Sequence, residues 1–193
     1  AAVTDVVLHQ AIGAAAEWHS AGPCDLSVAV NLFAPSLTDT TLPDRIAQVL
    51  TTHQLPARLL TVEITEHFLL SNLERARAVV RDLRNIGLRI SIDDFGSGYS
   101  TLSYLCDLPV DEVKLDRKLV LPFLEDRKVA TEVRGAIGIA HDLGLTTVAE
   151  GVETADVARR LSDYGCDLVQ GFYFSPPVTA EDILQAILTE AQG

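Results

Sequence analysis

Methionine is absent from this chain of 193 residues, and cysteine and tryptophan are scarce, with three and one residues respectively. The cysteines Cys24, Cys106 and Cys166 lie far apart and form no Cys-x-x-Cys pair, which argues against a disulfide framework or a zinc knuckle. Reduced thiols and a cytoplasmic location are therefore expected. A chain of this size without one internal methionine, opening in a helical pattern, also leads us to expect a piece of a longer protein.

Basic residues are few, with 15 lysines and arginines against 27 acids and a net charge of −12. Without a basic stripe to neutralise a polyanion, binding to a DNA or RNA polymer is not expected. No apolar run is long enough to span a bilayer, and no basic start precedes an apolar segment, so no membrane contact is expected. The length and the 48% hydrophobic content predict one domain over residues 1–193.

Six short β-rich runs alternate with helical patterns along the chain. The runs cover residues 27–31, 60–65, 89–93, 112–116, 146–150 and 167–174. The helical patterns cover roughly 5–19, 43–53, 73–86, 99–105, 127–143, 155–164 and 180–191. Gly87, Gly144 and Gly165 follow three of these helices, where a left-handed C-cap favours glycine. Such alternation predicts parallel strands joined by crossover helices.

Polar or charged residues stand at the carboxyl end of each predicted strand. A closed barrel brings all these ends to one face, whereas an open doubly wound sheet spreads them along a line. We therefore predict an α/β fold of the TIM-like (β/α)8 barrel type, truncated at its N-terminus to about six βα units, with about two strands before Ala1. The residues are Asn31, Glu63, Glu66, Asp93, Asp94, Lys114, Asp116, Glu150, Glu153 and Gln170.

The segment SIDDFGSGYS at residues 91–100 is the most informative of these strand ends. Asp93 and Asp94 end an apolar strand where Gly96 and Gly98 permit unusual backbone angles and close approaches. Adjacent carboxylates repel each other unless a cation or a base lies nearby. An Asx turn that merely closes a strand would explain the same letters.

The strand-end residues form a set of hard oxygen ligands suited to Mg²⁺ or Mn²⁺. Two such ions, bridged by an aspartate, would lower the pKa of a bridging water and neutralise a phosphodiester under attack. Lys114 could hold that water or the phosphate, and Glu150 could bind a metal or accept a proton. A simple ion pair between Lys114 and Asp116 along the strand is the alternative for that pair.

The motifs VNL at 30–32, EITE at 63–66, DDFGSGYS at 93–100, KLD at 114–116, AEGVE at 149–153 and QGFYFSPP at 170–177 resemble the EAL domain family of cyclic di-GMP phosphodiesterases. The resemblance implies a TIM-like barrel that hydrolyses cyclic di-GMP to linear pGpG with two Mg²⁺ or Mn²⁺ ions. It also implies a homodimer and further domains in the parent protein.

Residue by residue, the resemblance implies metal ligation by Asn31, Glu63, Asp93, Asp94, Asp116 and Glu150, with Glu150 and Lys114 catalytic. Glu66 resembles a glutamate that steadies the DDFGSGYS loop of Gly96 and Gly98, and Glu153 and Gln170 resemble residues that support the substrate site. Two positions depart from the family pattern. The Glu-Ala-Leu segment, with its metal-binding glutamate and phosphate-binding arginine, is absent, and Pro176 stands where a basic residue is usual.

Without that segment the chain itself is expected to be impaired, since even the loss of groups that only support metal ligands costs about 10–100-fold. A receptor that binds cyclic di-GMP without cutting it is the alternative function. A metal-dependent barrel lyase or aldolase fits the fold but not the series of motifs.

Overall fold

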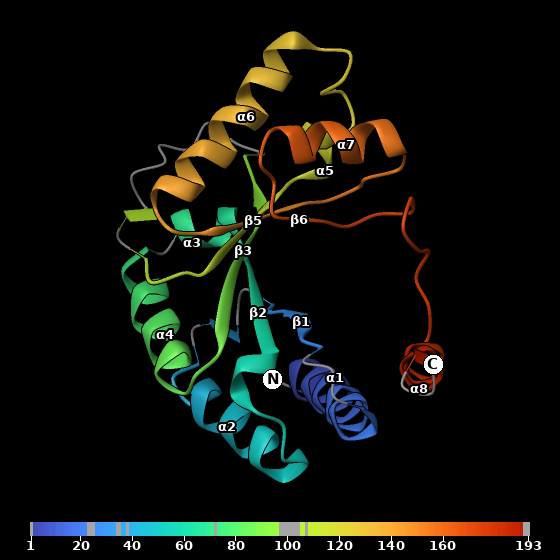
Figure 1. Cartoon of the computed structure of the whole chain (residues 1–193). Helices are drawn as coiled ribbons and strands as arrows, with labels where there is room; N and C mark the ends of the chain where they lie inside the picture. Colours follow the sequence, from blue (N-terminus) through green and yellow to red (C-terminus); the bar gives the residue numbers. More distant parts are fainter. Residues whose placement is uncertain are drawn as a thin grey trace. The chain divides into compact units, whose positions relative to one another are not determined.

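The computed structural model describes residues 2–22, 26–33, 36–37, 39–71, 73–96, 105–106 and 108–190. Helices and strands alternate along the chain, as the sequence predicts (Figure 1). The strands are β1 (Val28–Asn31), β2 (Leu60–Thr65), β3 (Arg89–Phe95), β4 (Glu112–Leu115), β5 (Thr146–Ala149) and β6 (Leu168–Val169). The helices are α1 (Ala2–Ala21), α2 (Leu42–His53), α3 (Glu66–Ser71), α4 (Leu73–Asn85), α5 (Arg117–Val120), α6 (Arg127–Asp142), α7 (Ala155–Asp163) and α8 (Ala180–Glu190).

The strands form one six-stranded sheet in the order β1-β2-β3-β4-β5-β6. The pairs β1–β2, β3–β4, β4–β5 and β5–β6 are parallel, with Asn31 opposite Glu63 and Lys114 opposite Val148. A doubly wound sheet reverses its strand order at a switch point, and this sheet never does. The strand order is therefore the one found in a barrel. Within each unit the strands are parallel, so their carboxyl ends lie at the same edge of the sheet.

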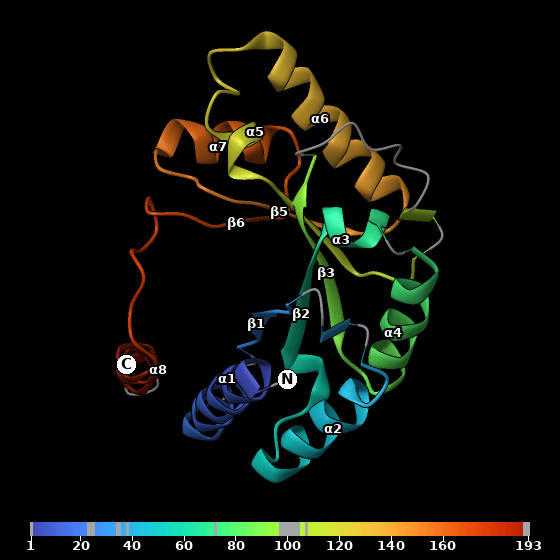
Figure 2. The same cartoon turned by 180° about the vertical axis from the view of Figure 1, so that it is seen from behind.

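The chain forms two compact units, and the first comprises residues 1–64, 72–90 and 177–193. In it, α1 packs against α2, α8 and β1. The Trp18 indole Nε1 donates a 3.0 Å hydrogen bond to the Ala180 carbonyl, which links α1 to the start of α8. The unit is seen from behind in Figure 2, where α1 and α2 again lie side by side.

The second unit comprises residues 65–71 and 91–176. Its longest helix, α6, begins at Arg127 and is N-capped by Asp126, whose carboxylate accepts hydrogen bonds from the amides of Lys128 and Val129. Val133, Ile137 and Ala140 recur at helical spacing and are buried where α6 packs against β5. Three of the four residues of β5 are buried as well, so the apolar face of α6 and strand β5 both belong to the core of this unit.

Helix ends agree with the glycine prediction. Gly87, Gly144 and Gly165 have φ angles of 92°, 74° and 85°, the left-handed region in which glycine is favoured. The predicted helix over 99–105 falls mainly on residues 97–104, which lie outside the described part of the chain. Two short helices, α3 and α5, were not predicted because each begins directly at a strand end and is too brief to show a periodic pattern.

The predicted strand over 167–174 is wrong beyond Val169. β6 covers only Leu168–Val169, and Phe174 N donates to the Gly171 carbonyl as the chain turns. Phe172 and Phe174 are 64% and 55% exposed, so they do not lie on a buried strand. Alternating apolar letters misled the prediction because aromatic side chains in a turn produce the same pattern.

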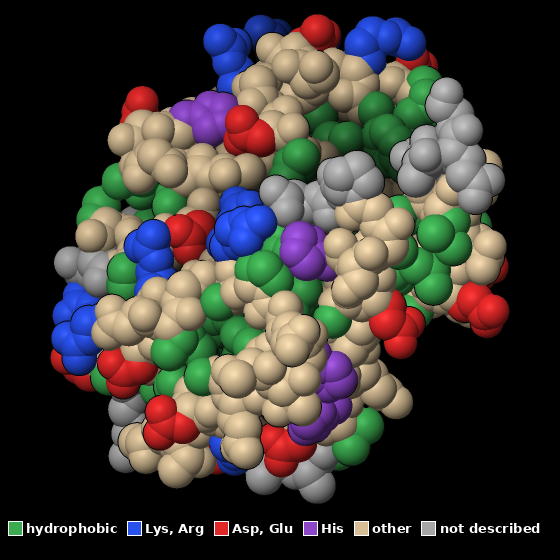
Figure 3. Space-filling view, turned by 60° about the horizontal axis from the view of Figure 1, so that its bottom comes forward, with side chains coloured by type: hydrophobic (Ala, Val, Ile, Leu, Met, Phe, Trp, Pro, Cys, Tyr) green, Lys and Arg blue, Asp and Glu red, His purple; other side chains and the backbone are tan. Residues whose placement is uncertain are grey.

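Charge of both signs is distributed over the surface. On the face drawn in Figure 3, lysine and arginine side chains are interspersed with aspartates and glutamates. In the described part of the chain, no helix combines the length and apolar character needed to cross a membrane.

Candidate metal and substrate site

Asp93 and Asp94 lie at the carboxyl end of β3, where the strand departs from regular geometry. The β3–β4 register shifts between Ile92 and Phe95, and Asp94 has a φ of 57°. The Asp94 amide donates a 3.0 Å hydrogen bond to Asp93 Oδ1. This bond joins adjacent residues, so it is not the Asx turn of the alternative, which needs the amide two residues on. The strand instead contains a bulge between Ile92 and Phe95. Its consequence is that the strict alternation of faces along a strand no longer applies to these two carboxylates.

Lys114 joins two of the predicted acids. Its Nζ lies 2.5 Å from Glu150 Oε1 and 4.0 Å from Asp93 Oδ1, and its side chain is only 7% exposed. Lys114 comes from β4, while Glu150 directly follows the neighbouring strand β5. The parallel pairing of β4 with β5 thus delivers a cation and a carboxylate to the same strand ends.

Asp116 stands one residue beyond β4 and caps α5. Its Oδ1 accepts a 2.9 Å hydrogen bond from the Lys118 amide. Its Oδ2 is buried and has no hydrogen-bond partner among the described residues, although Lys118 Nζ lies 3.7 Å away. A buried carboxylate oxygen without a hydrogen bond is costly, unless a cation binds it.

Electrostatics indicate that the acids crowd one another. Burial raises the pKa of Asp94, and the negative charges of Asp93 and Asp116 raise it further, against a smaller lowering by Lys118 and Lys114. The donor set and the orphan oxygen of Asp116 fit a hard divalent cation, which would relieve this repulsion. Yet among the described residues no three acidic, histidine or cysteine side chains converge tightly enough to enclose a metal ion.

Glu66 fixes the beginning of the segment that follows β3. Its Oε2 accepts a 3.0 Å hydrogen bond from the Gly96 amide, and the residue is 2% exposed. Gly96 has a φ of 85°, and a Cβ there would lie 2.6 Å from Leu119 Cδ1. The positive φ favours glycine at this position, whereas a change of the Leu119 rotamer would relieve the overlap. Gly98, predicted for the same loop, lies outside the described residues.

A cavity of about 210 Å³ opens beside Glu150 and includes the predicted supporting residues Glu153 and Gln170. The Arg117 Nη2 lies 2.7 Å from Glu153 Oε1, so an ion pair crosses from α5 to the segment after β5. Sequence reasoning missed Arg117 and Phe172, which also line the cavity. The sequence feature that could have identified them is their position, because Arg117 directly follows the KLD motif and Phe172 directly follows Gln170 and Gly171.

Asn31 and Glu63 belong to the other unit, where their contact is direct. Asn31 Nδ2 donates a 2.8 Å hydrogen bond to Glu63 Oε2, and the two residues are paired in the β1–β2 register. Glu63 is 5% exposed. The structure therefore brings the predicted residues together in two groups, one in each unit.

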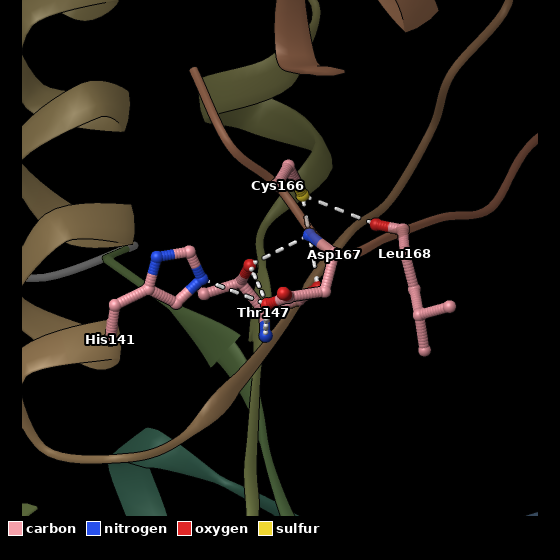
Figure 4. Close-up of polar contacts among 5 residues, drawn as sticks. All are labelled: His141, Thr147, Cys166, Asp167 and Leu168. Atoms are coloured by element: carbon pink, nitrogen blue, oxygen red, sulfur yellow. Dashed lines mark hydrogen bonds and ion pairs between the residues drawn. The ribbon is translucent and has the colours of Figure 1, made fainter. Parts of the chain in front are cut away.

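One polar cluster outside the predicted site includes His141 and Cys166 (Figure 4). Asp167 accepts hydrogen bonds from the Thr147 amide and hydroxyl, and its Oδ2 lies 2.9 Å from His141 Nε2. Burial raises the pKa of the Cys166 thiol. The cluster lies at the amino ends of β5 and β6, opposite to Glu150 and Gln170, and joins these strands to α6.

The winding of the sheet and the acids at its strand ends define an α/β barrel-type protein with a candidate divalent-metal site. The sequence matches the EAL domain model over residues 1–177, and the chain belongs to this family.

Similar proteins agree with the assignment. The cyclic di-GMP phosphodiesterase NbdA of Pseudomonas aeruginosa is 37% identical over 190 residues, which are 97% of this chain and 24% of NbdA. The MucR phosphodiesterase of the same organism, solved as a c-di-GMP complex, has a TM-score of 0.90 and 34% identity, covering 94% of this chain and 73% of that one.

A further solved relative contains a metal. BlrP1 of Klebsiella pneumoniae, a manganese and cyclic di-GMP complex, has a TM-score of 0.82 and 31% identity, covering 89% of this chain and 43% of that one. These likenesses confirm the predicted fold class. The chain spans about a quarter of the length of the curated relatives it matches.

Proposed function

We propose that this chain provides the catalytic domain for metal-dependent hydrolysis of cyclic di-GMP to linear pGpG. The observation that supports the proposal most is the arrangement around Lys114, which lies between Glu150 and Asp93 at adjacent strand ends. We infer the reaction itself from two facts: the chain belongs to the EAL family, and its relatives include cyclic di-GMP phosphodiesterases.

The proposed metal ligands are Asn31, Glu63, Asp93, Asp94, Asp116 and Glu150, holding two Mg²⁺ or Mn²⁺ ions. When bound, such ions lower the pKa of a bridging water and neutralise charge on the phosphodiester. The buried Oδ2 of Asp116, which has no hydrogen-bond partner among the described residues, supports this assignment. The charges of Asp93 and Asp116 also support it, because they add to the effect of burial in raising the pKa of Asp94.

Lys114 and Glu150 are the proposed catalytic pair. The ammonium of Lys114 would orient the attacking water or a phosphate oxygen, since it is a compact donor held among carboxylates. Glu150 would accept the proton that the water loses, and its contact with Lys114 keeps the carboxylate in a defined position. Glu66 and Gly96 would hold the loop after β3, and Glu153 and Gln170 would line the substrate cavity.

A receptor that binds cyclic di-GMP without cleaving it is the second candidate. One observation favours it: among the described residues, no three acidic, histidine or cysteine side chains converge closely enough to hold a metal ion. A homodimer, further domains in the parent protein and a cytoplasmic location remain predictions under either function.

The test is an assay of pGpG formation by chromatography, with the chain joined to a Glu-Ala-Leu segment at its amino end, in Mn²⁺ and again in EDTA. We expect product only with metal, and loss of at least about 100-fold in turnover for Glu150→Gln, as is usual for a general base. Glu125→Gln is the control, because Glu125 lies on an exposed turn beyond α5. Equal turnover by the two variants would refute the proposed role of Glu150.

A further inference from the structure

A second cavity, of about 600 Å³, lies in the second unit and is lined by residues of the turn over 121–125, α6 and α7 and by Tyr164. None of its lining residues belongs to the metal and substrate site described above. The argument depends on six of them: Phe123, Glu125, Arg127, Arg134, Arg160 and Tyr164.

Three arginines face one glutamate around this cavity. Among the described residues, no carboxylate lies within ion-pair distance of Arg127, Arg134 or Arg160. Neighbouring arginines behave differently, since Arg159 pairs with Asp156 at 3.1 Å. Three uncompensated guanidinium groups are unexpected in a chain with a net charge of −12.

The floor of the cavity is apolar and well packed. Phe123 is 2% exposed, and its ring lies 6.0 Å from the Tyr164 ring at an interplanar angle of 71°. Arg160 Cζ lies 5.4 Å above the Tyr164 ring, a cation–π contact that limits the conformations of the arginine. Arg160 is therefore held with its donors available, which reduces the entropy lost when a ligand binds.

We propose that this cavity binds a small molecule that carries a phosphate group. The planar fork of arginine donates two parallel hydrogen bonds to a phosphate, and Arg127 and Arg134 lie two turns apart on one face of α6. The volume lies within the range of about 300–1,000 Å³ that is usual for small-molecule sites. Three cations in an acidic chain are too few for a nucleic-acid polymer.

The experiment is an NMR titration of the ¹⁵N-labelled chain with inorganic pyrophosphate, in EDTA so that no metal can bind phosphate at the carboxylates. We expect saturable amide shifts centred on 123–134 and 160–164. Arg134→Ala should weaken binding about tenfold or more, since a hydrogen bond to a charged group contributes about 1.5–3 kcal/mol. Arg159→Ala is the matched control, and Arg127→Ala is a second exposed variant should Arg134→Ala unfold.

A second arm compares GMP with guanosine and separates an organic phosphate from an inorganic anion. Tighter binding of GMP than of pyrophosphate identifies an organic ligand, and the reverse order identifies an inorganic one. Saturation by guanosine alone would overturn the proposal, because the arginines would then contribute nothing. Absence of saturable shifts, or equal affinity in the Arg134→Ala and Arg159→Ala variants, would overturn it as well.

Discussion

The two carboxylate oxygens of Asp116 have different environments. Oδ1 caps α5 through the Lys118 amide, while Oδ2 is buried without a hydrogen bond in the described structure. Asparagine is as good an N-cap as aspartate, so a change to asparagine separates capping from metal binding.

We predict that Asp116→Asn leaves the thermal stability of the metal-free protein nearly unchanged but weakens Mn²⁺ binding by at least about tenfold. Asp126→Asn is the matched control, since Asp126 caps α6 through the Lys128 amide at 2.7 Å and lies outside the proposed site. Isothermal titration with Mn²⁺ checks both variants. Equal Mn²⁺ affinity in the two would show that Asp116 is only a helix cap.

Asp167 makes stability depend on pH. Burial raises the pKa of its carboxyl, but hydrogen bonds from the Thr147 amide, His141 and the Thr147 hydroxyl outweigh this and lower it. A carboxyl whose pKa is lower in the folded state stabilises the protein above its unfolded pKa, and loses this effect as the pH falls through the folded pKa.

Asp167→Asn should therefore cost about 1 kcal/mol at pH 7, a figure reduced for the 41% exposure of the side chain. The difference from the parent chain should shrink below about pH 4, where the unfolded carboxyl becomes protonated first, and it should be lost once the pH falls below the lower folded pKa. Urea unfolding at several pH values measures this difference in the free energy of unfolding. A constant difference at every pH would assign the effect to packing instead.

At the scale of elements, the segment after β5 depends on Gly151. This residue has a φ of 71°, and a Cβ there would lie 2.4 Å from Arg117 Cγ. The segment carries Glu150 and Glu153, and Arg117 is the ion-pair partner of Glu153. The backbone conformation at Gly151 therefore determines the positions of both the proposed base Glu150 and Glu153 in the wall of the substrate cavity.

Gly151→Ala should destabilise the chain by about 1–3 kcal/mol through steric overlap and backbone strain. It should also lower cyclic di-GMP affinity, which calorimetry measures. Gly135→Ala is the control, because a Cβ at Gly135 in α6 meets nothing within 4 Å. That change should stabilise the chain by about 0.5–1 kcal/mol. The account of the segment fails if Gly151→Ala is as stable as Gly135→Ala.

The sequence predicts the elements better where they are long and periodic. β2 is placed to the residue, and α6 is placed within one residue because its one buried face recurs at helical spacing. The length of β6 was overestimated, and helix α5 was missed because four residues are too few to show a periodic pattern. Asp93, Lys114 and Glu150 were predicted from strand ends alone, whereas Arg117 and Phe172 depend on how turns fold back, which no local pattern records.

At the scale of the whole molecule, the acids of the site should make stability depend on metal. A ligand that binds only the folded state stabilises it by about 2.7 kcal/mol at 100 times its dissociation constant. We predict a rise in melting temperature of about 5–10 °C in Mn²⁺, reduced to about half or less in Asp116→Asn. Calorimetry with Mn²⁺ and with EDTA checks this, and equal shifts in both proteins would place the metal elsewhere.

The central claim is that the site cleaves cyclic di-GMP. The most direct measurement is pGpG formation with Mn²⁺ by the chain and by the chain joined to a Glu-Ala-Leu segment at its amino end. The account predicts product from the joined form that disappears with EDTA and with Glu150→Gln. Tight binding of cyclic di-GMP by the joined form, with no pGpG, would contradict it and make the protein a receptor.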